Sequence, residues 1–196
     1  MAFTADTAFE ARITNNENDI LSHVAGKYYA SSDWADCDAG RLVIADTVLA
    51  CEGFSGVYNE NTWKMVDATD ATTIDTPIYA CDTYDNQLGT VKGNDYFIGT
   101  ETLGLGVPAG RYGNFTRIHF DGQSRYRFGV GNFSTTVGAN GFATIDDGKL
   151  VPAASAPTTA GTPYFIIAGT GKFVEGAHES FAYYDVIATK CSVAAG

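Results

Sequence analysis

The 196-residue chain is 13% aromatic and 18% charged, and its net charge at neutral pH is −11. This length fits one well-buried domain, and the many Tyr, Phe, Gly, Thr and Val residues are typical of a β-rich protein. The acidic balance disfavours nucleic acid as a partner, because neutralising phosphates requires clustered Lys and Arg side chains. No stretch approaches the roughly 18 apolar residues that span a bilayer, and no secretory signal is visible, so we expect cytosolic synthesis and no membrane partner.

The N-terminal segment has the pattern of a helix. Apolar side chains, among them Phe9 and Ile13, recur at spacings that fit one helical face, and Gly26 fits a helix end. We therefore expect residues 1–26 to form a helical arm. Such an arm either docks on its own sheet or packs on a neighbouring subunit.

An acidic loop is expected at residues 31–40, where three aspartates lie near a glycine. Asp33, Asp36 and Asp38 fit a turn in which carboxylates accept hydrogen bonds from nearby amides. The calcium loop of an EF-hand has a different spacing, and no glutamate stands at its twelfth position, where Thr47 occurs. We therefore expect no metal here.

Short strands joined by turns are predicted between residues 41 and 98. The runs 41–45 and 47–51 form either a tight hairpin or one bent strand, and residues 59–61 are expected to form a turn. Further strands are predicted at 77–81, 88–91 and 96–98.

The clearest period-two pattern covers residues 114–133 and predicts a β-hairpin closed by residues 122–124. Its apolar face would pack on a core, and its other face would carry Arg117, Arg125 and Arg127 as a cationic patch. One interpretation is that these arginines pair with the protein's own carboxylates. The other is that their guanidinium groups bind an acidic protein surface.

The C-terminal part begins with a loop-rich excursion at residues 134–163, in which Asp147-Gly148 is a strong two-residue hairpin turn. Strands are predicted at 164–168 and 181–189, with a glycine turn at 169–171 after the first of them. The complete pattern predicts a mainly-β fold. We expect a single domain, an antiparallel sandwich or barrel with the N-terminal helical arm.

The sequence shows no catalytic set. Its three histidines accompany no GxSxG or cysteine nucleophile motif, and its glycine-rich segments lack the spacing of nucleotide-binding loops. The four cysteines form no CxxC pair, so buried free thiols are expected rather than a zinc site. We therefore expect no enzyme and no cofactor.

The N-terminal third contains the segments FEARITNN at residues 9–16, DILSHV at 19–24 and SDWADC at 32–37. These segments resemble small structural proteins of tailed bacteriophages of gut bacteria, of the kind encoded near the major capsid protein. The resemblance implies a head decoration, cement or head-fibre protein that binds capsomers in many copies and self-associates. It assigns no residue roles.

We therefore expect a virion structural protein on the capsid surface, made in the host cytoplasm. Its partners would be the major capsid protein or another virion protein, together with further copies of itself. The expected contact residues are Arg117, Arg125 and Arg127, with Phe9 and Ile13 on the arm. The alternatives are a tail or neck component and a carbohydrate-binding module, in which Trp34 or Trp63 would stack on a sugar.

Overall fold

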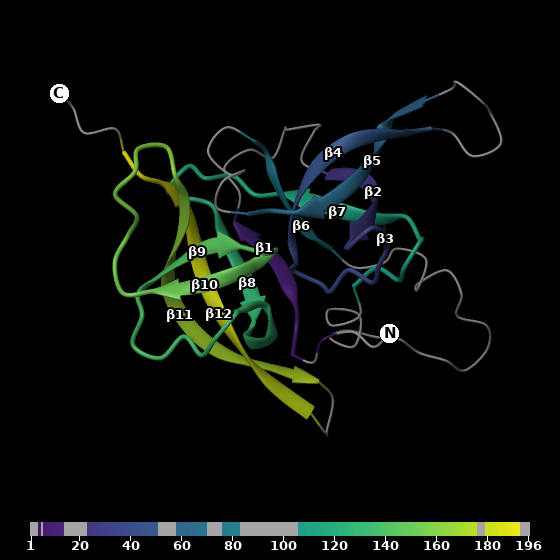
Figure 1. Ribbon diagram of the computed structural model, residues 1–196. Helices are drawn as coiled ribbons and strands as arrows, with labels where there is room; N and C mark the ends of the chain where they lie inside the picture. The colour runs from purple at the N-terminus through teal and green to yellow at the C-terminus, as the bar shows by residue number, and fades with distance from the viewer. Residues whose placement is uncertain are drawn as a thin grey trace.

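Figure 1 shows a computed structural model of the chain, which is mainly β. The structure describes residues 4, 6–13, 23–50, 58–69, 76–82, 106–175 and 179–192. This part of the chain contains twelve strands and a short 3-10 helix at Val130–Asn132. The strands are β1 (Phe9–Ile13), β2 (His23–Ala30), β3 (Asp33–Trp34), β4 (Leu42–Ala50), β5 (Tyr58–Asp67), β6 (Ile78–Cys81), β7 (Gly113–Arg117), β8 (Arg125–Gly129), β9 (Phe142–Asp146), β10 (Lys149–Ala153), β11 (Pro163–Glu175) and β12 (Glu179–Lys190). The described residues contain no helix with the length and hydrophobicity of a membrane span.

Five strands close into a barrel. Their order is β2-β5-β4-β6-β7, and a further pairing of β7 with β2 completes the ring. The β2–β5 pairing is parallel, whereas the other four are antiparallel. Short β3 pairs with the end of β2 beside the barrel.

The other six strands form an antiparallel sheet in the order β1-β8-β12-β11-β9-β10. The long β11–β12 hairpin of this second sheet projects beyond the body at the bottom of Figure 1. The mainly-β prediction is therefore confirmed, with a barrel and a separate sheet both present.

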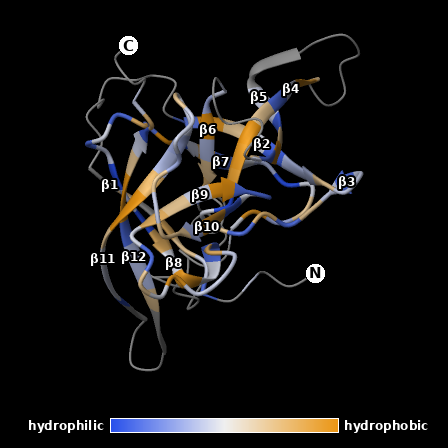
Figure 2. Ribbon diagram, turned by 60° about the vertical axis from the view of Figure 1, so that its left-hand side comes forward, coloured by the Kyte–Doolittle hydropathy of each residue, from blue (hydrophilic) through white to orange (hydrophobic). Residues whose placement is uncertain are grey.

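The barrel and the second sheet pack against each other through strands such as β6, which has one side in the barrel interior and the other in the core beside the second sheet. In β6, Ile78 and Ala80 belong to the core of the second sheet, whereas Tyr79 and Cys81 point into the barrel. All four β6 residues are buried, as expected for a strand that is covered on both faces. Figure 2 shows hydrophobic stretches in β6 and β9, on the two sides of this contact.

The prediction of an N-terminal helical arm is wrong. Residues 9–13 form β1, an edge strand that pairs with β8, and β2 begins at His23. Phe9 is buried with its ring 6.0 Å from that of Tyr126 and 5.3 Å from that of Phe128. Apolar residues four apart fit a helix, but burial against the aromatic residues of β8 overrides this local preference.

The predicted central hairpin is also wrong, although its two strands exist. β7 pairs with β2 and β6 in the barrel, whereas β8 pairs with β1 and β12 in the second sheet. Residues 118–124 carry the chain from one sheet to the other. Asp121 fixes the bend, because its carboxylate accepts hydrogen bonds from the amides of Gln123 and Ser124 at 2.8 and 2.7 Å.

Other predicted turns have mixed outcomes. The turn at Asp147-Gly148 is confirmed: it joins β9 to β10 with φ angles of 48° and 70°. β4 is the bent strand of the two alternatives, with an irregular register between Ala45 and Thr47. The turns at 59–61 and 169–171 are wrong, because β5 and β11 continue through them beside long antiparallel partners. The hairpin predicted from residues 88 to 98 lies outside the described residues.

Candidate contact surface

The structure does not assemble the predicted arginine patch as a hairpin face. Arg127 is bound within the chain, because its Nε lies 2.9 Å from Oδ1 of Asp185 and its guanidinium 3.7 Å from the Tyr183 ring centroid. Arg125 is exposed on the same strand. Arg117 lies on β7 of the barrel, in register with Tyr79 rather than with β8. Of the three, Arg125 is the one that the structure leaves as an exposed cation on β8.

The two predicted arm contacts lie in β1. Phe9 is 3% exposed and belongs to the core, so it does not offer a surface to a partner. The backbone of Ile13 pairs with that of Arg125 on β8. The side chain of Ile13 is not among the described ones.

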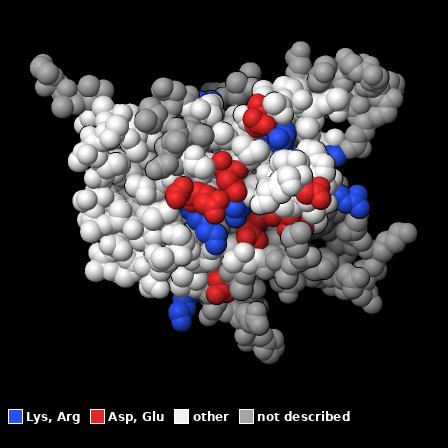
Figure 3. All heavy atoms as spheres, in the orientation of Figure 1, with Lys and Arg blue, Asp and Glu red and all other residues white. Residues whose placement is uncertain are grey.

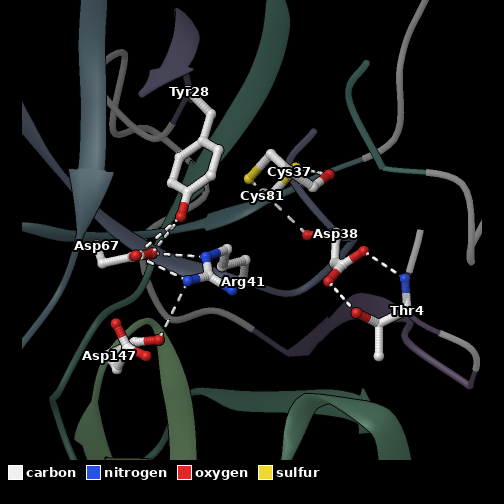
Figure 4. A network of polar contacts seen from close by, with 8 residues as sticks. All are labelled: Thr4, Tyr28, Cys37, Asp38, Arg41, Asp67, Cys81 and Asp147. Carbon is white, nitrogen blue, oxygen red and sulfur yellow. Dashed lines mark hydrogen bonds and ion pairs between the residues drawn. The ribbon is translucent and has the colours of Figure 1, made fainter. Parts of the chain in front are cut away.

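Three side chains, Tyr28, Arg41 and Asp67, form a mostly buried polar network where the barrel meets the second sheet. The guanidinium of Arg41 donates hydrogen bonds of 2.5 and 2.7 Å to the two carboxylate oxygens of Asp67. The hydroxyl of Tyr28 lies 2.8 Å from both of these oxygens. Figure 4 shows the three side chains converging, with Tyr28 from β2, Asp67 from the end of β5 and Arg41 from the residue before β4.

The electrostatics of this network follow from its burial. Burial raises the pKa of the Tyr28 hydroxyl above its usual range, since a buried phenolate is poorly solvated. Burial alone would lower the pKa of Arg41, but its hydrogen bonds to the Asp67 carboxylate more than offset this effect, so that pKa is raised. Arg41 therefore stays protonated and Tyr28 stays neutral at physiological pH.

The turn between β9 and β10 forms hydrogen bonds to this network and to the backbone beside it. Arg41 donates a hydrogen bond of 3.3 Å to the carbonyl oxygen of Asp147 (Figure 4). The backbone of Gly148 accepts from Leu42 at 2.8 Å and donates to Ala68 at 2.9 Å. These contacts give Arg41, Asp67 and Tyr28 a structural role, since they join the barrel to the hairpin of the second sheet.

In the acidic loop, Asp33 makes the expected bond to a nearby amide, that of Trp34 at 2.7 Å, whereas Asp36 and Asp38 bind amides far away in the sequence. Asp36 accepts a hydrogen bond of 2.8 Å from the amide of Ala109, and Asp38 accepts one of 2.8 Å from the amide of Thr4. These two carboxylates therefore hold distant segments of the chain, one before β7 and the other at the N-terminus. Within the part of the chain that the structure describes, no group of three or more His, Cys, Asp or Glu side chains is placed to hold a metal ion.

A surface that the sequence did not predict lies on the outside of the barrel. It consists of two lysines from β2 and β5 and three aromatic residues, and we call it the lysine–aromatic face. Its members are Lys27, Tyr29, Trp34, Lys64 and Tyr112.

Each lysine of this face lies over an aromatic ring. The Nζ atom of Lys27 is 4.1 Å from the ring centroid of Tyr112 and 5.8 Å from that of Trp34. The Nζ atom of Lys64 is 4.2 Å from the ring centroid of Tyr29, which meets Trp34 edge-on at 5.3 Å. These cation–π contacts restrict the positions of both ammonium groups.

The sequence alone accounts for two members of the lysine–aromatic face, Lys27 and Tyr29. Alternation along β2 places Lys27 and Tyr29 on one face, opposite to the buried Tyr28. The neighbour across the sheet is Lys64, which pairs in register with Lys27 through the parallel β2–β5 ladder. No local pattern predicts that ladder. Trp63, next in sequence to Lys64, packs against the barrel interior instead.

Comparison of the chain with protein-family models, with curated proteins and with solved structures found no match.

Proposed function

We propose that the chain is a virion structural protein of a tailed bacteriophage, of the capsid decoration, cement or head-fibre kind. It binds an acidic surface of the major capsid protein or of another virion protein through the lysine–aromatic face, and it self-associates on the particle. The resemblance of the N-terminal segments supports the virion role. The geometry of the barrel surface supports the mode of contact.

The observation that carries the proposal is the in-register pair of Lys27 and Lys64 on neighbouring strands. Like charges directly opposite each other in a sheet destabilise it, so this pairing has a cost in the free protein. Asp46 lies 3.3 Å from Lys64 and offsets part of this cost. A partner that places carboxylates over both ammonium groups would add favourable charge contacts to the face.

The rings of the face add to this contact. Tyr112 is 40% exposed, and aromatic residues are enriched in the centres of protein interfaces. In Figure 3, acidic and basic side chains gather near the middle of the molecule, and most of the surface on the left of that view is uncharged.

Mass spectrometry with copy-number estimation on purified phage particles tests the virion role. We expect the wild-type chain in stoichiometric amounts relative to the major capsid protein. The double variant Lys27→Glu, Lys64→Glu should lower its occupancy by about tenfold or more, since it replaces two attractive contacts by two repulsive ones.

The matched control reverses two exposed lysines of the second sheet, Lys172→Glu and Lys190→Glu. It changes the net charge equally and should leave occupancy near the wild-type value. Thermal unfolding of both variants shows whether either change affects folding. A folded Lys27, Lys64 variant with undiminished occupancy would exclude this face as the interface, and absence of the chain from particles would exclude the virion role.

The exposed ring of Tyr112 and its neighbour Trp34 also favour a second candidate, a carbohydrate-binding function. A glycan array on the folded protein tests it. Binding that is lost in Tyr112→Ala and kept in Lys27→Gln, Lys64→Gln would indicate stacking on a sugar rather than electrostatic docking on a protein.

Cross-linking in intact particles separates a head location from a tail or neck location by the protein to which the chain is joined.

A further inference from the structure

Two thiols lie together inside the barrel. Cys37 and Cys81 are both free, and both have 0% of their surface exposed. The Sγ atom of Cys81 is 3.6 Å from the carbonyl oxygen of Cys37. Figure 4 shows their sulfur atoms side by side.

The backbone around these cysteines is held close by hydrogen bonds. The carbonyl oxygen of Cys81 accepts from the amide of Gly40 at 2.7 Å, and the amide of Cys81 donates to Arg41 at 2.9 Å. The loop that carries Cys37 therefore runs directly beside the end of β6, although the two cysteines are 44 residues apart in sequence. Close approach of the two chain segments is the first condition for a disulfide between these cysteines.

We propose that Cys37 and Cys81 are a site of covalent modification, at which a low-molecular-weight disulfide oxidises the thiol pair to an intramolecular disulfide. This inference does not depend on the proposed virion role. The bond would tie the acidic loop to β6 across the interior of the barrel, and it would form when the protein leaves a reducing cytosol for an oxidising medium.

The reaction proceeds by two thiol–disulfide exchanges. In the first, the sulfur of Cys37 attacks one sulfur of glutathione disulfide, which forms a mixed disulfide and releases one glutathione thiol. In the second, the sulfur of Cys81 attacks the Cys37 sulfur of the mixed disulfide and releases a second glutathione thiol. The protein loses two hydrogen atoms in total, and glutathione disulfide is reduced to two glutathione molecules.

The first exchange requires local opening of the loop. Cys37 is held to Val107 by an isolated bridge with hydrogen bonds of 2.8 and 2.7 Å. The loop begins at Ser31 and Ser32, whose φ angles of 50° and 84° are unfavourable for residues other than glycine. Opening the loop breaks this bridge and the hydrogen bonds of Asp36 and Asp38, but it leaves the strands of the barrel paired, so it costs less than unfolding the barrel. Once the loop closes again, Cys81 is the thiol in position to complete the disulfide.

Trypsin separates all four cysteines, which makes the pairing directly measurable. Cleavage after Lys and Arg places Cys37 in peptide 28–41 and Cys81 in peptide 65–92, while Cys51 and Cys191 fall in peptides 42–64 and 191–196. The purified full-length protein is incubated with glutathione disulfide, quenched with acid, alkylated in denaturant, digested and analysed by mass spectrometry.

We expect an intact mass lower by two hydrogens and a linked pair of peptides 28–41 and 65–92. The Tm should rise by roughly 5–10 °C and return to its former value with dithiothreitol, because the crosslink restricts the unfolded chain. Cys191→Ser should behave as the wild type, whereas Cys81→Ser should stop at the mixed disulfide. Full alkylation of Cys37 and Cys81 after oxidation, glutathione adducts alone, or a link to Cys51 or Cys191 would each overturn the proposal. The wild-type peptide map decides even if a variant does not fold.

Discussion

Asp67 accepts hydrogen bonds from two side chains of the barrel, so both of its carboxylate oxygens are occupied by Arg41 and Tyr28. Its side chain and that of Arg41 are only 18% and 17% exposed. The pair is therefore mostly removed from water. Neutralising one member would leave the other as a buried charge without a counter-ion, which is costly.

We expect Asp67→Asn to lower the free energy of unfolding by about 3 kcal/mol or more, since it leaves the Arg41 guanidinium uncompensated. Asp46→Asn is the matched control. It removes the same charge from the pair with Lys64, whose side chains are 42% and 28% exposed, and should cost no more than about 1 kcal/mol. Urea denaturation of both variants measures the difference. Equal losses would show that the Asp67 network does not stabilise the fold through its burial.

Asn132 has a comparable role at the base of the second sheet. Its side-chain oxygen accepts a hydrogen bond of 3.0 Å from the amide of Ala8, and its nitrogen donates one of 2.6 Å to the carbonyl of Ala39. One buried amide thus connects the segment before β1 to the acidic loop. Such groups are placed by tertiary contacts and have no sequence signature.

At the scale of elements, the β9–β10 hairpin has a turn that its own residues specify and a contact with the barrel that they do not. Asp147 and Gly148 adopt left-handed backbone angles, which the Asp-Gly sequence favours in two-residue turns. The turn then docks on the barrel through Arg41 and the backbone of Leu42 and Ala68. The conformation of the turn depends on Asp147 and Gly148 alone, whereas its contact with the barrel depends on residues far away in the sequence.

Gly148→Ala tests the docking. A Cβ atom at this position would collide with the Asp67 carboxylate and crowd Arg41, in addition to the strain at its φ of 70°. We expect a loss of about 2 kcal/mol or more in the free energy of unfolding. Gly138→Ala serves as the control, because its φ is 58° and nothing lies within 4 Å of its Cβ position, so it should cost only about 1 kcal/mol from backbone strain. Chemical denaturation with equal losses at both positions would argue against a tightly packed joint.

At the scale of the whole molecule, β4 and β6 couple the two parts of the fold. Leu42 of β4 belongs to the core of the second sheet, and the next residue, Val43, belongs to the barrel interior. A strand with both faces buried cannot leave one core without exposing the other. We therefore expect the whole chain to unfold as one cooperative unit.

The two tryptophans make this testable, because Trp34 and Trp63 both lie in the barrel part of the structure. Val186→Ala removes two methyl groups from the second sheet, where Val186 is fully buried, and should cost about 2 kcal/mol. Tryptophan fluorescence and far-UV circular dichroism should lose signal together and at the same lowered denaturant midpoint. A fluorescence midpoint unchanged from the wild type would show that the barrel unfolds independently of the second sheet.

Much of the strand content is predictable from the residues themselves. The apolar side of β8 is as expected, with Tyr126 and Phe128 buried, and the Asp147-Gly148 turn stands where the sequence places it. In β7 the prediction of one buried face is wrong, because Phe115 and Thr116 on opposite sides of the strand are both buried. The N-terminal helix failed because a spacing of four apolar residues does not exclude a strand when aromatic residues elsewhere bury it. The central hairpin failed because alternation specifies which side of a strand is buried and does not specify its neighbour.

The sequence by itself determined a β-rich, acidic chain, the buried face of β8 and the turn between β9 and β10, since these depend on residues close together along the chain. Only the tertiary structure decided that β7 and β8 belong to different sheets, that Arg127 binds Asp185, and that Lys27 lies beside Lys64. The physical reason is that strand partners are chosen by burial and backbone hydrogen bonding summed over distant segments. The candidate contact surface and the thiol pair arise from such long-range pairings, so they become visible only in the folded chain.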